Sequence, residues 1–168
     1  EVRPVYQEKE WIQEQLGEAR ADAIVNQTRN LCLYPNVYLM DQFSTQIRVI
    51  RPVAVDKTEV TIYCFAPKGE SAENREVRIR QYEDFFNVSG MGTPDDLADL
   101  EDCQIGDRGT KAQWSEMERG LSAMLRGPDD LARGLGAQVV SSAPRWDHET
   151  LYHGYFRRWA GLMGDHDG

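Results

Sequence analysis

The 168-residue sequence is short of the residues that build metal centres, with only three cysteines and three histidines. Cys32, Cys64 and Cys103 are widely separated and form none of the paired motifs of zinc or iron–sulfur sites. Scattered cysteines of this kind are typical of reduced, intracellular proteins, and we expect them to be small core residues. The histidines all lie between His148 and His166, near the end of the chain. These signals indicate no self-contained metal site.

Long apolar runs and an excess of positive charge are also missing. No apolar run approaches the ~18 residues of a membrane span, and no hydrophobic segment follows the first residues as it does in a signal peptide. We therefore expect a cytoplasmic protein. With 28 acidic and 19 basic residues the formal charge is −9, so nucleic acid is not an expected partner, because phosphate binding needs a basic surface. The sequence lacks an initiator methionine, and we expect a fragment of a longer protein.

The remaining composition suits a folded domain. Hydrophobic residues make up 40% of the chain, which predicts a packed core. Apolar spacing predicts a helix over residues 5–28, and strand-forming residues predict strands over 30–40, 44–55 and 59–66. Pro35 either bends the first strand or keeps it at an edge. The last two strands alternate in polarity, which predicts a hairpin with one face in water.

Helices dominate the second half of the pattern. A long helix is expected from about residue 73 to 86, ended by the glycines around Met91. Another begins with Thr93 as N-cap and Pro94 at its first position. Shorter helices are expected over 113–126, 128–135 and 145–163. This order predicts an α+β fold in which an antiparallel sheet packs on a long helix.

Two adjacent acids are candidates for chemistry. Asp95 and Asp96 lie in the first turn of the helix after residue 93, where acidic side chains commonly do no more than interact with the helix dipole. The alternative is that one of them turns inward as a carboxylate ligand, with Phe86 and Met91 close to the bound group. The residues by themselves leave this choice open.

Other polar residues invite a functional interpretation with less support. Asn30 lies on an apolar strand, where it needs either a backbone partner or a cavity. His148 and His153 are five residues apart, which on a helix places their rings about 140° from each other. We therefore expect both histidines, and His166, at the surface and not around a metal.

Several segments, taken in order and at their spacing, resemble one enzyme family. They are NLCLYPNVYLMD at 30–41, QIRVIRPV at 46–53, KTEVTIY at 57–63, RQYEDFFN at 80–87 and SGMGTPDDL at 89–97. Together they resemble the C-terminal half of the catalytic domain in Rieske non-haem iron ring-hydroxylating dioxygenases. The sequence of these segments is most similar to that of the large (alpha) subunit of the benzoate and toluate 1,2-dioxygenase type. The resemblance extends over roughly residues 5 to 160.

The resemblance implies a fold and a set of site residues. The fold is the helix-grip, START-like catalytic domain, of which residues 1–168 would be the C-terminal, substrate-binding part, with the Rieske domain outside this chain. Asp96 would be the catalytic carboxylate that holds the iron. The implied substrate-pocket residues are Asn30, Leu39, Met40, Phe86 and Met91.

The resemblance also implies cofactors and partners. Such enzymes hold one mononuclear Fe(II) by two histidines and a carboxylate, receive electrons from a Rieske 2Fe-2S cluster, and draw them from NADH through a separate reductase. They convert an aromatic carboxylate such as benzoate, with O2, to a cis-dihydrodiol. Their alpha subunits assemble with one another and with small beta subunits.

The departures from the family pattern carry their own expectations. The two histidine ligands of the family precede the aligned region, and His148 and His153 follow Asp96, so they are not substitutes. We therefore expect the chain alone to be inactive and to bind iron weakly. The substrate carboxylate needs a donor, either Asn30 or an arginine that the sequence does not locate. The alternative function is a free-standing helix-grip module that binds a small molecule without metal.

Overall fold

The computed structural model describes residues 3–111 and 114–164. The chain divides into two compact units, Glu1–Lys111 and Ala112–Gly168, and each is described by itself. No helix within the described ranges has the length and apolar character needed to span a membrane.

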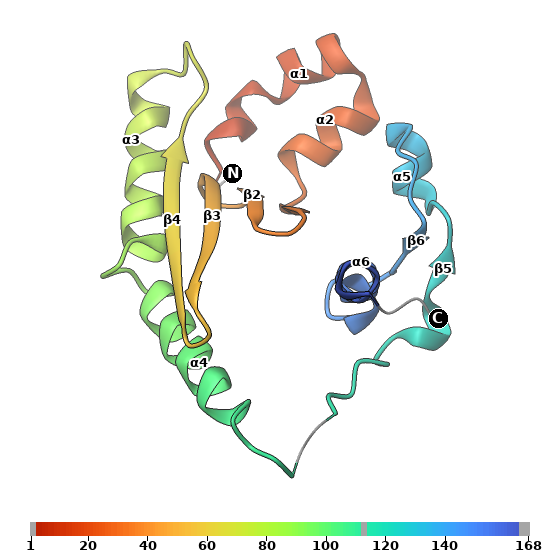
Figure 1. Ribbon diagram of the computed structural model, residues 1–168. Coiled ribbons are helices and arrows are strands. Elements are labelled where there is room, and N and C mark those ends of the chain that lie inside the picture. The colour runs from red at the N-terminus through yellow and green to blue at the C-terminus, as the bar shows by residue number, and fades with distance from the viewer. Residues whose placement is uncertain (1–2, 112–113, 165–168) are drawn as a thin grey trace. The chain divides into compact units, whose positions relative to one another are not determined.

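The first unit opens with short helices where a single helix was predicted over 5–28. They are a 3-10 turn (Pro4–Glu8), α1 (Lys9–Leu16) and α2 (Glu18–Val25) (Figure 1). The break falls at Gly17, whose φ of +82° is open to glycine and strained for other residues. The turn lets α1 and α2 fold onto each other, so that Ile12, Ala21 and Val25 bury a small core.

A four-stranded antiparallel sheet follows, in the spatial order β1-β2-β3-β4. Its strands are β1 (Arg29–Leu33), β2 (Val37–Asp41), β3 (Thr45–Ala54) and β4 (Lys57–Phe65). The prediction of one strand over 30–40 is wrong. Pro35, which cannot donate to a strand ladder, lies in a turn with a cis Tyr34–Pro35 bond, and the segment forms a hairpin of two strands.

The two faces of the sheet differ from the expected pattern. Cα partners align Tyr38, Arg48 and Ile62 on one face, together with Gln46. This face looks toward the helices, because Arg48 and Ile62 line a groove with helical residues, and Gln46 is fully buried. The side of the sheet that carries the polar residues Gln46 and Arg48 is therefore the inner side. The other face leaves Tyr63 57% exposed.

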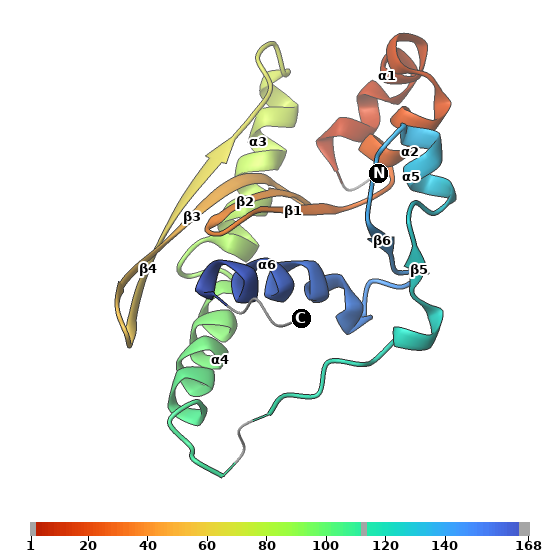
Figure 2. The ribbon, with the colours of Figure 1, turned by 45° about the vertical axis from the view of Figure 1, so that its right-hand side comes forward.

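Two helical segments run in succession along the inner side of the sheet (Figures 1 and 2). They are α3 (Ala72–Gln81), which continues into a π turn (Tyr82–Phe86), and α4 (Thr93–Gly106). The N-cap of α4 is Gly92, one residue before the predicted Thr93. The Thr93 hydroxyl instead donates to the Phe86 carbonyl at 2.8 Å, which ties α4 to the π turn. The predicted α+β fold, an antiparallel sheet packed on a long helix, is confirmed.

A buried ion cluster joins α3 to the sheet. Glu70 and Arg78 have side chains only 6% and 7% exposed, and their closest oxygen and nitrogen atoms are 2.5 Å apart. Arg75 adds a second contact to the Glu70 carboxylate at 3.0 Å, and Arg78 donates to the Thr45 hydroxyl at 3.1 Å. Burial by itself raises the pKa of Glu70, but the hydrogen bonds and charges of Arg78 and Arg75 outweigh it, so the pKa lies below its usual value.

This lowered pKa predicts an acid-sensitive contribution to stability. The Glu70 carboxylate stabilises the folded chain fully above the ordinary glutamate pKa of about 4.3, and the contribution is lost as pH falls through the lower folded-state pKa. Urea unfolding of the chain and of Glu70→Gln, followed by circular dichroism across this range, tests the linkage. The difference in free energy of unfolding should shrink on acidification; a difference independent of pH would contradict the prediction.

The second unit is built from short elements. They are 3-10 turns at Leu121–Ala123 and Glu149–Tyr152, a two-stranded ladder of β5 (Leu125–Arg126) with β6 (Ser141–Ser142), and the helices α5 (Asp130–Leu135) and α6 (His153–Met163). Asp129 caps α5 by accepting from the Ala132 N–H at 2.8 Å. The helix predicted over 113–126 is wrong for residues 114–126, and residue 113 lies outside the described residues. The helix predicted over 145–163 begins only at 153.

Two expectations about single residues are also wrong. His148, expected at the surface, is buried, whereas Cys64 and Cys103, expected in the core, are exposed. His148 packs closely against Gly120, where an added Cβ would clash with its ring. Cys64 is exposed although it shares the inner face of the sheet with its cross-strand partner Gln46.

Candidate functional site

A groove of about 650 Å³ lies between the inner face of the sheet and the helices of the first unit. Its volume is within the ~300–1,000 Å³ typical of small-molecule sites. Its walls are mostly apolar, with the ionisable side chains of one arginine, one tyrosine and two aspartates among them. The lining residues are Arg48, Val60, Ile62, Tyr82, Phe86, Asn87, Val88, Thr93, Asp96, Leu97, Asp99 and Leu100.

Asp96 reaches the groove from the first turn of α4. Its backbone N–H donates to the Gly92 carbonyl at 3.1 Å, which is the first helical hydrogen bond after the N-cap. Pro94 and the acids favour a helix start at this point, and the helical turn then directs Asp96 to the lining while Asp95 is not part of it. The structure thereby distinguishes the two acids by position.

Phe86 lines the groove and is only 5% exposed. Its ring meets Phe85 edge-to-face, with centroids 4.9 Å apart, and lies 6.1 Å from Phe43, in the loop after β2. A Cβ on Gly92 would stand 2.6 Å from the Phe85 ring. The glycine therefore permits the close approach of α4 to this aromatic cluster.

Arg48 is the basic group of the groove. Its Nε donates to the Gln46 side-chain oxygen at 3.1 Å, and Gln46 is itself held by the Ser44 hydroxyl at 2.8 Å. The guanidinium carbon lies 5.5 Å from the centre of the Phe86 ring. Burial lowers the pKa of Arg48, while the nearby acidic groups of Asp96 and Tyr82 act on that pKa in the opposite direction. The arginine is thus partly desolvated and held on two sides.

The other predicted pocket residues lie apart from this groove. Asn30 and Met40 are on β1 and β2, on the inner face of the sheet, and Asn30 accepts a hydrogen bond from Gln42 at 3.2 Å. Leu39 points to the opposite face from Met40, because neighbouring residues alternate along a strand. Met91 is 76% exposed, in the turn before α4. The structure brings Asp96 and Phe86 together in the groove. The other four predicted residues are not part of the groove lining.

Sequence reasoning missed Arg48 as a groove residue. It lies in an alternating strand, where a charged side chain normally indicates the water-facing side. The available signal was that Gln46 and Arg48 share a face with apolar Ile62 across the hairpin, so one side of the sheet mixes polar and apolar groups.

The groove residues of this chain do not form a complete iron site. Open non-haem iron sites use about three protein ligands, two histidines and a carboxylate. Across the described ranges, no group of three or more histidine, cysteine, aspartate or glutamate side chains is placed to hold a metal ion. Asp96 offers one carboxylate of such a set.

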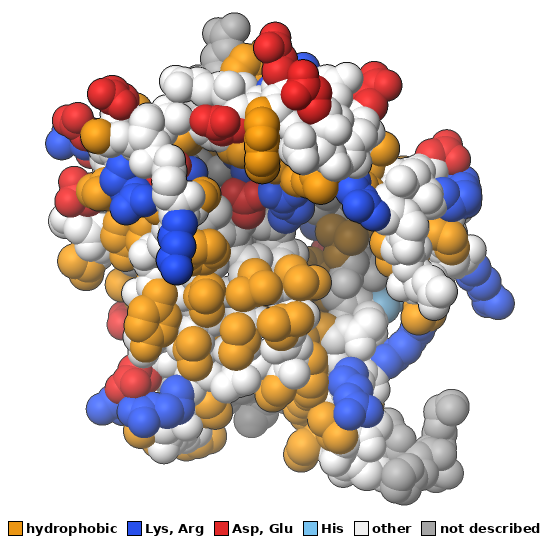
Figure 3. All heavy atoms as spheres, turned by 90° about the horizontal axis from the view of Figure 1, so that it is seen from above, with side chains coloured by type: hydrophobic (Ala, Val, Ile, Leu, Met, Phe, Trp, Pro, Cys, Tyr) orange, Lys and Arg blue, Asp and Glu red, His pale blue; other side chains and the backbone are white. Residues whose placement is uncertain are grey.

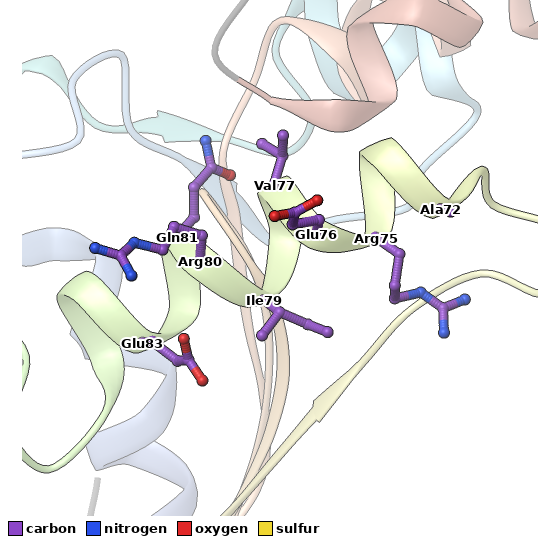
Figure 4. Close-up of a pocket in the computed structure, with 8 residues that line it drawn as sticks. All are labelled: Ala72, Arg75, Glu76, Val77, Ile79, Arg80, Gln81 and Glu83. Atoms are coloured by element: carbon purple, nitrogen blue, oxygen red, sulfur yellow. The ribbon is translucent and has the colours of Figure 1, made fainter.

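A second hollow, of about 660 Å³, lies along α3 and the π turn. All its lining residues come from this one continuous helical segment, between Ala72 and Glu83. Figure 4 shows their side chains pointing to different sides of the helix, with no common point toward which they converge. This surface lacks the second wall that the groove at Asp96 has.

The fold and the groove suit a catalytic domain that binds a small molecule, and comparison with known proteins identifies its family. Residues 4–164 match the family described as ring hydroxylating alpha subunit (catalytic domain), and the chain belongs to this family. The resemblance seen in the sequence is confirmed.

Three relatives show which members are similar. The 2-halobenzoate 1,2-dioxygenase large subunit of Burkholderia cepacia is 58% identical over 97% of the chain. Toluate 1,2-dioxygenase subunit alpha of Pseudomonas putida is 48% identical over 96%, and the anthranilate 1,2-dioxygenase large subunit of Acinetobacter baylyi is 45% identical over 98%. The chain spans 35% of the length of each of these proteins.

Proposed function

We propose that this chain is the C-terminal part of the catalytic domain of an aromatic-ring-hydroxylating dioxygenase alpha subunit that acts on an aromatic carboxylate such as benzoate. The observation that carries the proposal is the groove in which Asp96 meets Phe86 and further apolar residues. The three relatives support the substrate class, since their names specify a halobenzoate, toluate and anthranilate, all aromatic carboxylates.

The proposed overall reaction adds both atoms of O2 to adjacent ring carbons. NADH supplies the two electrons through a separate reductase and a Rieske 2Fe-2S cluster outside this chain, and two protons complete the cis-dihydrodiol. Mononuclear Fe(II), when bound, supplies the activation of O2. Asp96 would be its carboxylate ligand, and two histidines from outside the chain would complete the set. The small beta subunit and neighbouring alpha subunits are the proposed partners.

The residues of this chain would prepare the substrate for that reaction. Phe86, Ile62, Leu97 and Leu100 present apolar surface to the ring and exclude water, which strengthens electrostatic interactions in the groove. Because the chain provides one iron ligand, it is proposed to be inactive alone. Met91 in the turn before α4, and Asn30, Leu39 and Met40 on the sheet, remain predicted pocket residues that would need contacts from the rest of the protein.

Isotope labelling of the product tests this function. The full-length alpha subunit that contains this chain, assembled with its small subunit and reductase, is supplied with NADH, benzoate and ¹⁸O2. We expect a cis-dihydrodiol with two ¹⁸O atoms, detected by mass spectrometry, and no product when NADH is omitted. Failure to oxidise benzoate or its ring-substituted analogues in an iron-replete enzyme would refute the proposal.

A further inference from the structure

Arg48 lines the groove, and only some of the hydrogen-bond donors of its guanidinium have partners. Its Nε is used by Gln46, but Nη2 is buried and has no hydrogen-bond partner among the described residues. A buried donor on a charged group costs free energy when it is unpaired. Asp96 is near enough to influence the arginine electrostatically, yet the described part of the chain contains no ion pair between the two.

The support around Arg48 holds the guanidinium in a defined place. Ser44 and Gln46, both almost completely buried, form a chain of hydrogen bonds that ends at Nε, and the Phe86 ring packs against the guanidinium. Side chains held in this way lose little entropy on binding a ligand. The rigid planar fork also matches the two oxygens of a carboxylate.

Arg48 is the one basic side chain that this groove offers to an anionic ligand. Apart from Arg48, the ionisable side chains of the groove wall are Tyr82, Asp96 and Asp99, and the chain carries a formal charge of −9. The general field of the protein therefore does not attract an anion, so a local cation must provide the binding energy. The apolar walls suit an aromatic ring attached to that anion.

We propose that Arg48 binds the carboxylate of the aromatic substrate and so determines its orientation in the groove. This inference rests on the proposed function for its choice of ligand and deepens it by assigning the donor. The carboxylate supplies the acceptor that Nη2 lacks, and the ring extends along Phe86 toward the side lined by Asp96. Asn30, the other candidate donor, is not part of the groove lining.

The test compares an acid with its neutral amide. Binding of benzoate and of benzamide to the iron-replete full-length oxygenase, without reductase, is measured by calorimetry for the parent, Arg48→Gln and Arg48→Lys. We expect Arg48→Gln to weaken benzoate binding by about 10- to 100-fold, the range of a charged hydrogen bond, and to leave benzamide binding nearly unchanged. Arg48→Lys should recover part of the preference, because it keeps the charge but loses the fork.

The matched control is Arg51→Gln, on the same strand. Arg51 is exposed and pairs with Glu59 at the surface, so its loss should leave the benzoate-to-benzamide ratio unchanged. If Arg48→Gln weakened benzoate and benzamide binding equally, Arg48 would have a structural role only and the proposal would be overturned. The proposal would also be overturned if Arg48→Gln changed the affinity for neither ligand. Iron content, measured in parallel, should be the same in all variants.

Turnover separates this inference from the proposed function. A parent enzyme that binds benzoate through Arg48 without oxidising it would support the inference and refute the function. A parent enzyme that oxidises benzoate, with a ratio of benzoate to benzamide affinity that Arg48→Gln does not change, would support the function and refute the inference. An enzyme that neither binds nor oxidises benzoate would overturn both.

Discussion

Replacement of Asp96 by alanine in the full-length alpha subunit is expected to abolish ring hydroxylation and to deplete the mononuclear iron. Loss of groups that only orient a metal ligand costs about 10- to 100-fold in affinity or activity, so loss of a ligand itself should reduce turnover by more than about 100-fold. The visible spectrum of the Rieske cluster should remain, because Asp96 lies in a groove formed by β3, β4 and the helices of this chain. Metal analysis and the spectrum measure the two effects together.

The neighbouring acid is the matched control for this experiment. Asp95→Ala removes the same charge from the same helical turn, but Asp95 does not line the groove. Both variants should lose a similar small favourable interaction with the helix dipole, about 0.3–1 kcal/mol. An Asp96→Ala enzyme that is active and holds its full iron would eliminate Asp96 as ligand; equal iron loss in Asp95→Ala would show that the helix start alone explains the effect.

Disruption of the buried Glu70–Arg78 pair is expected to have the largest effect on stability. Arg78→Met leaves the Glu70 carboxylate, which is only 6% exposed, without its closest counter-charge. Removing one partner of a buried pair costs about 3–5 kcal/mol, a large share of the ~5–15 kcal/mol that stabilises an ordinary domain. Urea unfolding of the chain, followed by circular dichroism, measures the loss.

Two variants control for the loss of packing and of surface charge. Arg80→Met, on the same helix, removes an exposed partner of Asp84 and should cost about 0–1 kcal/mol. The double variant Glu70→Gln/Arg78→Met should be more stable than Arg78→Met alone, because no uncompensated charge remains buried. If Arg78→Met and Arg80→Met destabilise the chain equally, the buried cluster contributes no more than a surface pair.

Local sequence patterns were sufficient for the class of fold and for the family. Strand-forming segments joined by tight turns predicted the hairpin of β3 and β4, and Thr93 and Pro94 predicted the start of α4 to within one residue, because hydrogen bonding within hairpins and helix turns involves near neighbours. The family resemblance of the same segments singled out Asp96 and Phe86, which the fold then places in one groove.

The predictions of elements and burial were wrong where the environment of a residue depends on distant parts of the chain. The turn at Pro35, the break at Gly17 and the burial of His148 each require knowledge of what packs nearby. The sheet is the clearest case: alternation along β3 establishes that Gln46 and Ile47 point to opposite faces, but it does not say which face the helices cover. The usual rule that polar side chains face water would place Gln46 and Arg48 on the wrong side of the sheet.

The sequence by itself therefore determined the class of fold and the family, and the resemblance to that family singled out Asp96 as the predicted ligand. Only the tertiary structure decided that the polar face of β3 is the inner one, that Gln46 is buried, and that Arg48 shares a groove with Asp96 and Phe86. The physical reason is that side-chain periodicity is a local property of the backbone. Burial, and the lack of a hydrogen-bond partner for Arg48 Nη2 among the described residues, depend instead on contacts among β3, β4, the π turn and α4, which are brought together only by folding.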